Sequence, residues 1–430
     1  MSIDVARLLL LEDVRVILDF LFPSPSPHSS SALPTQDPIS PPTHLGSASD
    51  WARWLGYTLW LWLCLTLSAQ ARVLLRIGIA VEVPKVTLGS SSPARILDAQ
   101  GQPVAEVSGM TPLTASRTGQ TVQVGTVSGS RLYLQPTSAD GLVFIGKNWY
   151  RGLVELVPDQ SGLTAINQVG LDDYVSSVVG SEMGHRFPSE ALKAQAVAAR
   201  SYALFHRTLR TQEVFDLGSG QDWQVYKGVA AESNRTQSAA RDTSGQVLTY
   251  QGSIINAVFH SSSGGHTEDV ANVWIEPLPY LKGVPDFDAA APVFSWSATF
   301  SSQELQQKFG GIGAINQVGI TQRSPTGRAM QMQLVGTSGS KQISADEFRA
   351  ALGLRSTMFE ITAQGAATTA SLVPVSGLPS LFSLKGRGFG HGVGMSQWGA
   401  AGLATQGWSF QQILAHYYQG SNLAVVEGSP

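Results

Sequence analysis

The sequence predicts a mixed α+β fold that is rich in β-structure and contains one central helix. Its 430 residues include 44 glycines and 22 prolines, and 43% are hydrophobic against only 14% charged. This composition is typical of a β-rich, turn-rich globular protein. Short β-like runs separated by Gly, Ser and Asn turns fill residues 96–156, as expected of a small all-β unit. One long run of strong helix formers begins at Ala191, which predicts the helix.

Composition also excludes some classes of function. The net charge is −3 and no basic run is present, which argues against a nucleic acid partner. The only cysteine is Cys64, so an internal disulfide and a thiolate metal cluster are both excluded. The length is sufficient for a large core and for two or three domains.

The first 71 residues are predicted to precede the folded part. Residues 1–50 form a leader, in which acidic residues interrupt an apolar run and a Pro, Ser and Thr-rich stretch follows; we expect this stretch to be disordered. Residues 51–71 resemble a secretory signal peptide, with an apolar core at Leu55–Leu67 and a small-x-small site ending at Ala71. The core is shorter than the roughly 20 residues of a spanning helix, which favours a signal over a membrane anchor.

We therefore expect an exported protein, located in the periplasm or cell wall, whose signal peptide is cleaved after Ala71. The signal lies unusually far from Met1. Either the true start is downstream of Met1, or the leader is unusually long.

The remaining chain divides into three parts. Residues 72–165 form an N-terminal β-rich part that begins with a strand at Val73–Val83. Residues 166–290 form a central part with a short helix at Asn234–Arg241 and strands at Gln246–Tyr250 and Ile254–His260. Residues 291–430 form a C-terminal α+β part, which carries the Gly-rich motif GHGVGMSQWGA. Its expected elements are strands at Gln331–Val335 and Phe359–Thr362 and helices at Ala345–Leu352 and Ser409–Tyr418.

The central helix follows a turn that carries a single acid. Pro188 fits a first helical position, because its φ is already set and no amide bond is lost there. Lys193, Arg200 and Arg207 recur every seven residues and so share one helix face. Glu182 stands in the preceding Gly/Pro-punctuated turn. A lone carboxylate beside a cationic helix face is an arrangement suited to single-acid catalysis.

The run SEM followed by FPSEALKAQAVAARSYAL resembles the signature of the stage II sporulation protein D family, which includes the amidase-enhancer proteins. The resemblance continues through QVYKGV, HSSSGGHTE, PLPYLKGVPD and the Gly-rich motif, and covers residues 72–426 as one unit. It implies a mixed α+β fold packed around the central helix. It also implies that Glu182, the acid of the EM pair, is the catalytic residue of a peptidoglycan lytic transglycosylase.

One acid is sufficient for this reaction, whereas most glycosidases need two carboxylates. Protonated Glu182 would protonate the oxygen between N-acetylmuramic acid and N-acetylglucosamine. The resulting carboxylate would then take the proton of the muramyl C6 hydroxyl, which closes a 1,6-anhydro ring. A carboxyl with this double role needs a pKa raised by partial burial.

Several other residues are candidates for substrate binding. Lys193 and Arg200 are expected to face the same cleft as Glu182, although a solvated helix face is the ordinary alternative. Gln195 could bind sugar groups or be a core or surface glutamine. The HSSSGGHTE loop and the Gly-rich motif offer further polar groups, the latter with glycines that let backbone approach a ligand closely. The full set of candidates is Lys193, Arg200, Gln195, His260, Ser262, His391, Ser396 and Gln397.

No metal or other cofactor is expected. His260, His266 and Glu268 could be metal ligands, but the resemblance places their loop at the active cleft without requiring metal. Some relatives carry a Cys-His-Cys pattern just before QVY, which would bind zinc. This chain has Gly218, Asp222 and Trp223 there, so the soft ligands are missing.

The sequence thus favours an exported lytic transglycosylase that acts on peptidoglycan glycan strands. The main alternative is a non-catalytic glycan-binding protein that enhances a partner cell-wall amidase. A metal-dependent hydrolase at His260 and His266 is weaker. A serine hydrolase using Ser262 or Ser396 with His391 is also weaker, because neither serine lies in a G-x-S-x-G elbow.

Overall fold

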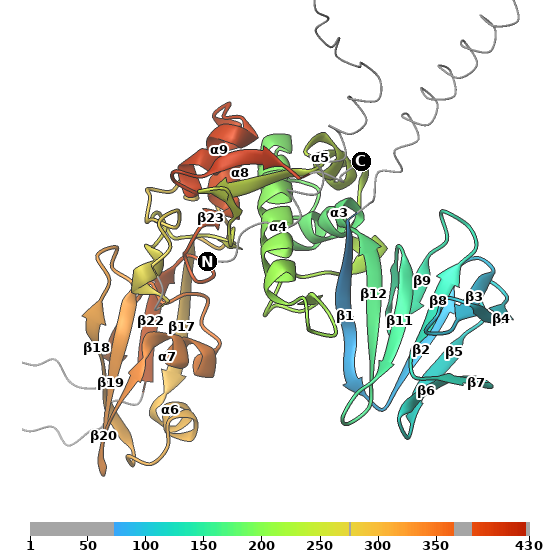
Figure 1. The fold of residues 1–430 in the computed structure, drawn as a ribbon. Coiled ribbons are helices and arrows are strands. Elements are labelled where there is room, and N and C mark those ends of the chain that lie inside the picture. Colours follow the sequence, from blue (N-terminus) through green and yellow to red (C-terminus); the bar gives the residue numbers. More distant parts are fainter. Residues whose placement is uncertain (1–72, 275–276, 365–380, 427–430) are drawn as a thin grey trace, which may run out of the picture. The chain divides into compact units, whose positions relative to one another are not determined.

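The computed structural model describes residues 73–274, 277–364 and 381–426 (Figure 1). The expected leader and signal peptide lie outside these residues. Within them, helices and a larger number of strands make up a mixed α+β, β-rich fold, which confirms the fold class predicted from the sequence. No helix in the described ranges is long and apolar enough to cross a membrane.

Two sheets form the N-terminal part. The larger has the order β13-β1-β12-β11-β8-β3-β4 and consists of β1 (Leu74–Val83), β3 (Ala94–Leu97), β4 (Pro103–Val107), β8 (Leu132–Pro136), β11 (Leu153–Pro158), β12 (Leu163–Gly170) and β13 (Leu217–Gly218). The smaller has the order β10-β9-β2-β5-β6-β7 and consists of β2 (Lys85–Ser90), β5 (Leu113–Thr118), β6 (Thr121–Val124), β7 (Val127–Gly129), β9 (Val143–Ile145) and β10 (Asn148–Tyr150).

An interior strand of the larger sheet leads straight into the helices. Strand β12 pairs antiparallel with both β1 and β11 and is buried along most of its length. Helix α3 (Leu171–Glu182) begins at the residue after β12 ends. Because β12 is held on both sides, the start of α3 is fixed by the sheet.

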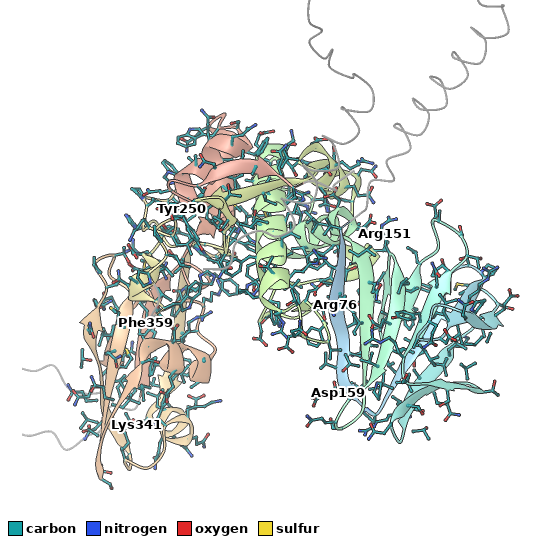
Figure 2. All side chains as sticks on the ribbon, viewed as in Figure 1. Arg76, Arg151, Asp159, Tyr250, Lys341 and Phe359 are labelled. Carbon is teal, nitrogen blue, oxygen red and sulfur yellow. The ribbon has the colours of Figure 1, made fainter. Side chains whose placement is uncertain are left out.

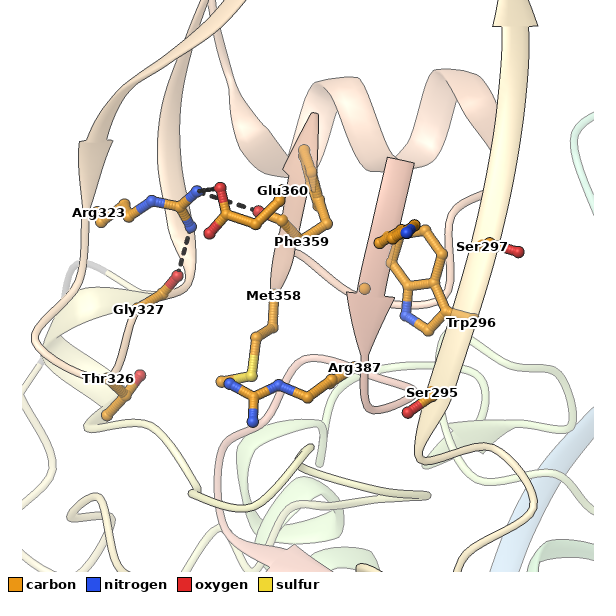
Figure 3. Close-up of a pocket in the computed structure, with 12 residues that line it drawn as sticks. Ser295, Trp296, Ser297, Arg323, Thr326, Gly327, Met358, Phe359, Glu360 and Arg387 are labelled. Carbon is orange, nitrogen blue, oxygen red and sulfur yellow. Dashed lines mark hydrogen bonds and ion pairs between the residues drawn. The ribbon is translucent and has the colours of Figure 1, made fainter. Parts of the chain in front are cut away.

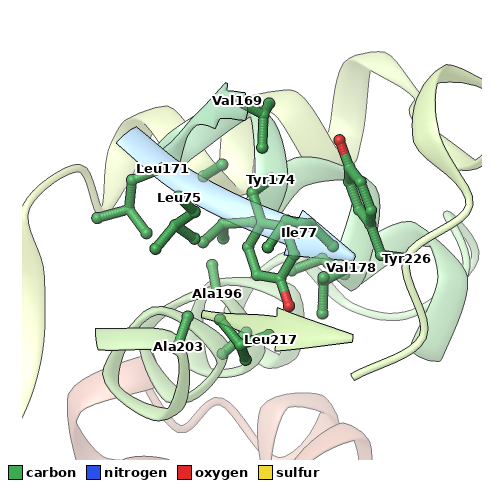
Figure 4. Packing of buried hydrophobic residues seen from close by; sticks show 14 of the residues in the cluster. Leu75, Ile77, Val169, Leu171, Tyr174, Val178, Ala196, Ala203, Leu217 and Tyr226 are labelled. Carbon is green, nitrogen blue, oxygen red and sulfur yellow. The ribbon is translucent and has the colours of Figure 1, made fainter. Parts of the chain in front are cut away.

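Helix α4 (Ser189–Leu209) packs against many neighbouring elements of the central part. It contacts α3, α5 (Asn234–Asp242), α8 (Gln397–Thr405), α9 (Phe410–Tyr417) and β14 (Gln246–Tyr250). Many of its buried residues are alanines, whose short side chains let these neighbours approach the helix closely. The core between the sheet and the helices includes Leu75, Ile77, Tyr174, Val178, Ala196 and Ala203 (Figure 4).

Two small sheets complete the central part. Strand β14 lies between β15 (Ser253–Ile254) and β24 (Asn422–Val425). Strand β16 (Phe259–His260) pairs parallel with β23 (Met395–Ser396), which brings the HSSSGGHTE loop beside the Gly-rich motif.

Arg151, labelled in Figure 2, forms an ion pair with Glu232 at 2.8 Å beside the short 3₁₀ helix η1 (Gly228–Ala231). A second 3₁₀ helix, η2 (Val270–Asn272), follows the HSSSGGHTE loop.

Residues 295–364 and 381–387 contribute a second hydrophobic core. Its sheets have the orders β17-β22-β21 and β18-β19-β20, and its helices are α6 (Ser302–Lys308) and α7 (Ala345–Leu352). The strands are β17 (Ser295–Ser301), β18 (Ile315–Arg323), β19 (Ala329–Gly336), β20 (Gly339–Ser344), β21 (Phe359–Gln364) and β22 (Leu381–Arg387). Phe309 and Phe348 stack inside this core, with ring centroids 5.3 Å apart. Helices α8 and α9, which the sequence grouped with this part, instead belong to the first core.

The structure corrects two local expectations. Residues 171–182 form helix α3, so Glu182 is the last residue of a helix and not part of a turn. The expected strand Ile254–His260 is reduced to two short pieces, β15 and β16. The helix after Pro188 is confirmed, although Pro188 is its N-cap and Ser189 the first helical residue.

Candidate functional site

Glu182 lies at the point where α3 ends and the chain turns toward α4. The turn uses Gly184 in the left-handed region (φ +73°), which favours glycine because it has no Cβ. The carboxylate Oε1 of Glu182 accepts a hydrogen bond from the backbone N–H of Val225 at 2.8 Å. Glu182 is partly exposed, so its carboxyl is both held by the fold and accessible to a ligand.

The surroundings of Glu182 favour its protonated form. Burial raises the pKa of the Glu182 carboxyl above its ordinary value, although the Val225 N–H, the Gln397 side chain and the charge of Lys227 act in the opposite direction. The C-terminal end of a helix carries partial negative charge, which also disfavours a carboxylate there. Glu182 is therefore a carboxyl that retains its proton to a higher pH than a solvated glutamate does.

Two tyrosines lie near this carboxyl. Burial, together with the negative charge of Glu182, raises the pKa of Tyr202 to about 12. The phenol of Tyr202 is thus neutral and able to donate a hydrogen bond at physiological pH. Tyr174 is fully buried and donates to Gln224 Oε1 at 3.1 Å, and Gln224 Nε2 donates to the carbonyl of Ala199 at 3.3 Å. These bonds fix the loop that carries Val225 against α3 and α4.

Gln397 reaches the site from the first residue of α8. The hydroxyl of Ser396 caps this helix by accepting from the Gly399 N–H at 3.1 Å. The side chain of Gln397 hydrogen-bonds Glu182, and its Nε2 also lies 3.5 Å from Oε1 of Gln195. Helices α3, α4 and α8 therefore converge on one carboxyl group.

Comparison with known proteins places this region in a family. A model described as stage II sporulation protein matches residues 159–250, and one described as a domain of unknown function (DUF8618) matches residues 269–394. Stage II sporulation protein D of Bacillus amyloliquefaciens is 34% identical over 280 residues, which cover 60% of this chain and 76% of the relative. The protein of the same name from Bacillus subtilis (strain 168) is 33% identical, with 60% and 76% covered.

The chain belongs to the stage II sporulation protein D family. The resemblance predicted from the sequence is thereby confirmed. The amidase enhancer of Bacillus subtilis (strain 168) is a further relative, 31% identical over 58% of this chain and 40% of the enhancer. Glu182, Tyr202 and Val225 all lie within the segment that the stage II sporulation protein model matches.

Arg200 does not face Glu182, contrary to the expectation from its spacing. Its side chain is fully buried. It donates to Asp172 at 2.7 Å and to the carbonyls of Ala240 and Gln246 at 3.0 and 3.1 Å. The seven-residue spacing does define one face of α4, but α3, α5 and β14 cover that face at Arg200. Arg200 therefore joins four elements of this family member and has no surface to offer to a glycan.

Lys193 and Gln195 also differ from the expected picture. Lys193 forms ion pairs with Glu190 at 3.1 Å and Asp242 at 3.7 Å at the edge of the same covered face. Gln195 is fully buried, and its Nε2 lacks a hydrogen-bond partner among the described residues. Of the two, only Gln195 lies beside the site, through its contact with Gln397.

His260 and His391 hold two loops together. The Nδ1 of His260 bonds the carbonyl of Val393, and the Nδ1 of His391 accepts from the N–H of the same residue, both at 3.1 Å. His391 Nε2 then donates to the carbonyl of Phe259 at 3.1 Å. Burial lowers the pKa of His391 to about 4 and that of His260 well below its ordinary value. Both imidazoles are therefore neutral near physiological pH.

The two serines have structural partners. Ser262 is fully buried and donates to Asp288 Oδ2 at 2.5 Å, while Ser396 caps α8. The hydrogen bonds of the described residues thus pair neither serine with His391, which removes the geometry that a serine hydrolase needs.

The residues considered for metal binding are also engaged elsewhere. Glu268 accepts from Ser324 at 2.5 Å and from Asn272 at 2.8 Å, and His266 Nδ1 bonds the Thr267 carbonyl at 2.6 Å. Across residues 73–274, 277–364 and 381–426, no three His, Cys, Asp or Glu side chains cluster closely enough to hold a metal ion.

Sequence reasoning missed three members of the site. Tyr202 lies within the run VAARSYAL, and Val225 and Lys227 lie within QVYKGV. Both runs carried the family resemblance, but Arg200 was their only residue that suggested chemistry. The role of Val225 rests on its backbone N–H, so the identity of its side chain could not predict it.

Proposed function

We propose that this protein is an exported peptidoglycan lytic transglycosylase in which Glu182 is the single acid and base. The observation that carries the proposal is the environment of Glu182: a partly buried carboxyl with a raised pKa at the C-terminal end of a helix. In the described part of the chain, the groups that act on this carboxyl are Val225, Gln397 and Lys227, and none is a second carboxylate. Membership of the stage II sporulation protein D family supports a role at the cell wall.

The first half of the reaction uses the raised pKa. Glu182 donates its proton to the glycosidic oxygen between N-acetylmuramic acid and N-acetylglucosamine, and the bond from that oxygen to the muramyl C1 breaks. The developing carboxylate is stabilised by the Val225 N–H, the Gln397 side chain and the positive charge of Lys227. These three groups favour the carboxylate that Glu182 becomes after it has donated its proton.

The second half returns the proton. The carboxylate of Glu182 takes the proton of the muramyl C6 hydroxyl, whose oxygen bonds to C1 and closes the 1,6-anhydro ring. Glu182 ends protonated and ready for the next bond. Because the nucleophile belongs to the substrate, the site needs neither a second carboxylate nor an activated water.

The decisive experiment replaces Glu182 by glutamine. The Gln side chain can still accept the Val225 N–H bond, but it has no titratable proton. General acid–base catalysis contributes about 10²–10⁴-fold per step, so release of anhydro-muramyl ends from sacculi, measured by mass spectrometry of the products, should fall below detection. Binding to sacculi should persist. Wild-type release of anhydro ends by the Gln variant would overturn the assignment.

The second candidate is a non-catalytic enhancer of a cell-wall amidase. The relative named amidase enhancer favours it. Under this alternative the wild-type protein leaves glycan strands intact, remains bound to sacculi and raises the rate of an added amidase. The same product analysis, run with and without an amidase, separates the two functions.

Export completes the proposal, because peptidoglycan lies outside the cytoplasmic membrane. Cleavage of the expected signal peptide, residues 51–71, would give a mature N-terminus at Arg72. Mass spectrometry of the secreted protein tests this, and a retained Leu55–Leu67 segment in the membrane fraction would favour an anchor.

A further inference from the structure

The part of the chain with the second core contains a pocket of about 600 Å³ (Figure 3). It is formed by strands β17, β21 and β22 together with the turn between β18 and β19. Its volume lies within the range of small-molecule sites, roughly 300–1,000 Å³. None of the residues that act on Glu182 lines it, so the pocket is separate from the site described above.

The pocket carries an excess of positive charge. Arg323, Lys385 and Arg387 line it, against Glu360 as the only carboxylate among its lining residues. Glu360 is already engaged, because Arg323 pairs with it at 2.8 Å and also donates to the carbonyl of Gly327 at 2.7 Å. The dashed lines in Figure 3 show these bonds, and none reaches Arg387. Two cations therefore remain for a ligand.

Lys385 and Arg387 are held on one face of a rigid strand. They are two residues apart on β22, so their side chains leave the same face of the sheet. Strand β22 is the middle strand, paired with β17 on one side and β21 on the other. Both side chains are exposed, and among the described residues neither forms an ion pair at 4.0 Å or less. Directly across from them on β17 lie Ser297 and Ser295, which also line the pocket.

Two cations without an ion-pair partner, beside serine residues, form a site for a hydrated anion that also carries hydrogen-bonding groups. A hydrophobic ligand would leave both charges unpaired. Arginine binds carboxylates through two parallel N–H donors, and lysine adds a point charge. The chemistry of the pocket thus selects a carboxylate on a polar, sugar-like or peptide-like molecule.

The pocket is joined directly to the loops that carry the family motifs. The backbone of β22 continues from Arg387 into the Gly-rich motif, and a Cβ on Gly264 of the HSSSGGHTE loop would lie 2.9 Å from the Cβ of Arg387. Thr326, on the pocket wall, donates a hydrogen bond to Glu268 of the same loop. A polymer held at the pocket is therefore held by the framework that builds these loops.

We propose that this pocket is a carboxylate-binding subsite for peptidoglycan, in which Lys385 and Arg387 bind the acidic group. The choice of polymer rests on the proposed function. Peptidoglycan carries carboxylates of one chemistry from two sources: the lactyl group of bare muramic acid, and the stem peptides. The subsite binds a carboxylate from one of these two sources. Comparing N-acetylmuramic acid with a free stem peptide in the test shows which source it binds.

The test measures binding of N-acetylmuramic acid to the full chain by NMR or calorimetry at low ionic strength. N-acetylglucosamine is the comparison ligand, because it is the same sugar without the lactyl ether group that carries the carboxylate, and a free stem peptide represents the second source. We expect N-acetylmuramic acid or the stem peptide to bind and N-acetylglucosamine not to bind. Lys385→Ala and Arg387→Ala should each weaken binding up to about fivefold, as expected for exposed ion pairs, and raised salt should weaken it further.

Lys341→Ala is the matched control, because Lys341 is an exposed lysine on β20 outside the pocket. This variant should bind as the wild type does. The proposal is overturned if neither acidic ligand binds, if the double Lys385→Ala/Arg387→Ala variant binds like the wild type, or if inorganic phosphate competes equally well. The readout does not involve cleavage. If the protein binds these ligands but releases no anhydro ends, the subsite proposal stands and the transglycosylase proposal is overturned.

Discussion

Arg200 on α4 donates to Asp172 on α3 through Nη2 at 2.7 Å, with the arginine wholly inside the protein. Removing one partner of a buried ion pair leaves the other charge uncompensated. Arg200→Met, which keeps much of the side-chain volume, should therefore lower the free energy of unfolding by roughly 3 kcal/mol. Activity per folded molecule should change little. Urea unfolding together with product analysis measures both quantities.

Lys193→Ala is the companion variant. Its ion pairs lie near the surface, so the change should stay within about 0.5 kcal/mol of stability. A stable Arg200→Met protein that has lost turnover would contradict the structural role and restore Arg200 to the catalytic machinery.

The pH dependence of activity should follow Glu182. The first step needs a protonated carboxyl, so turnover should fall as pH rises through the raised pKa of Glu182. Lys227→Met removes a positive charge that lowers this pKa, and so should move the falling limb of the pH–rate profile to higher pH. Lys147→Met makes the same change of net charge on the β9–β10 turn and should leave the limb in place. Equal shifts in both variants would mean that Lys227 acts only through net charge.

Glu182 should lower the stability of the folded protein above its raised pKa. Between the ordinary value of 4.5 and the raised value, the folded state binds more protons than the unfolded state, so stability decreases as pH rises through this window. Glu182→Gln lacks this titration. The variant should therefore be more stable than the wild type near neutral pH. This difference in stability should vanish at low pH, where the Glu182 carboxyl is protonated in both the folded and the unfolded state. Urea unfolding of both proteins across this pH range gives the measurement.

Gly392 should be intolerant of alanine. Its φ is +85°, and a Cβ would lie 2.3 Å from Cζ of the buried Arg328. Gly407 has a similar φ of +89°, but no atom lies within 4 Å of its Cβ position. Gly407→Ala should cost only the backbone strain, roughly 1–2 kcal/mol, whereas Gly392→Ala should cost clearly more. Similar midpoints of thermal unfolding in the two variants would show that Arg328 can move aside.

Activity should survive exhaustive chelation. Gly218, Asp222 and Trp223 replace the soft-ligand pattern of some relatives, and Gly218 packs against the ring of Trp223. Product release from sacculi should thus be equal before and after EDTA treatment. Loss of activity that zinc restores would return His260 and His266 to consideration as ligands.

The helices show what could be predicted from the sequence. Helix α7 has the predicted bounds Ala345–Leu352, because a run of good helix formers lies between Ser344 and Gly353, which cap it. The apolar residues of α3 fall at positions 171, 174, 175, 178 and 179, the spacing of a buried helix face. That signal was present, but the valines and serines of this stretch have weak helix propensity. Burial against the sheet and α4 supplies the stability that local preference lacks.

The candidate site shows what the sequence could not provide. Spacing places Arg200 and Lys193 on one helix face, but only the packing of α3, α5 and β14 shows that this face is covered at Arg200. The meeting of Glu182 with Gln397 joins residues more than two hundred positions apart. Such contacts depend on the tertiary fold, and no local pattern encodes them.

The bond between Glu182 and residue 225 has an evolutionary consequence. Its donor is a main-chain amide, which every amino acid except proline supplies. Mutations at position 225 to residues other than proline therefore retain this hydrogen-bond donor, provided that the loop keeps its path. This support for the acid is robust to genetic drift, whereas the contribution of Gln397 can be lost by a single codon change.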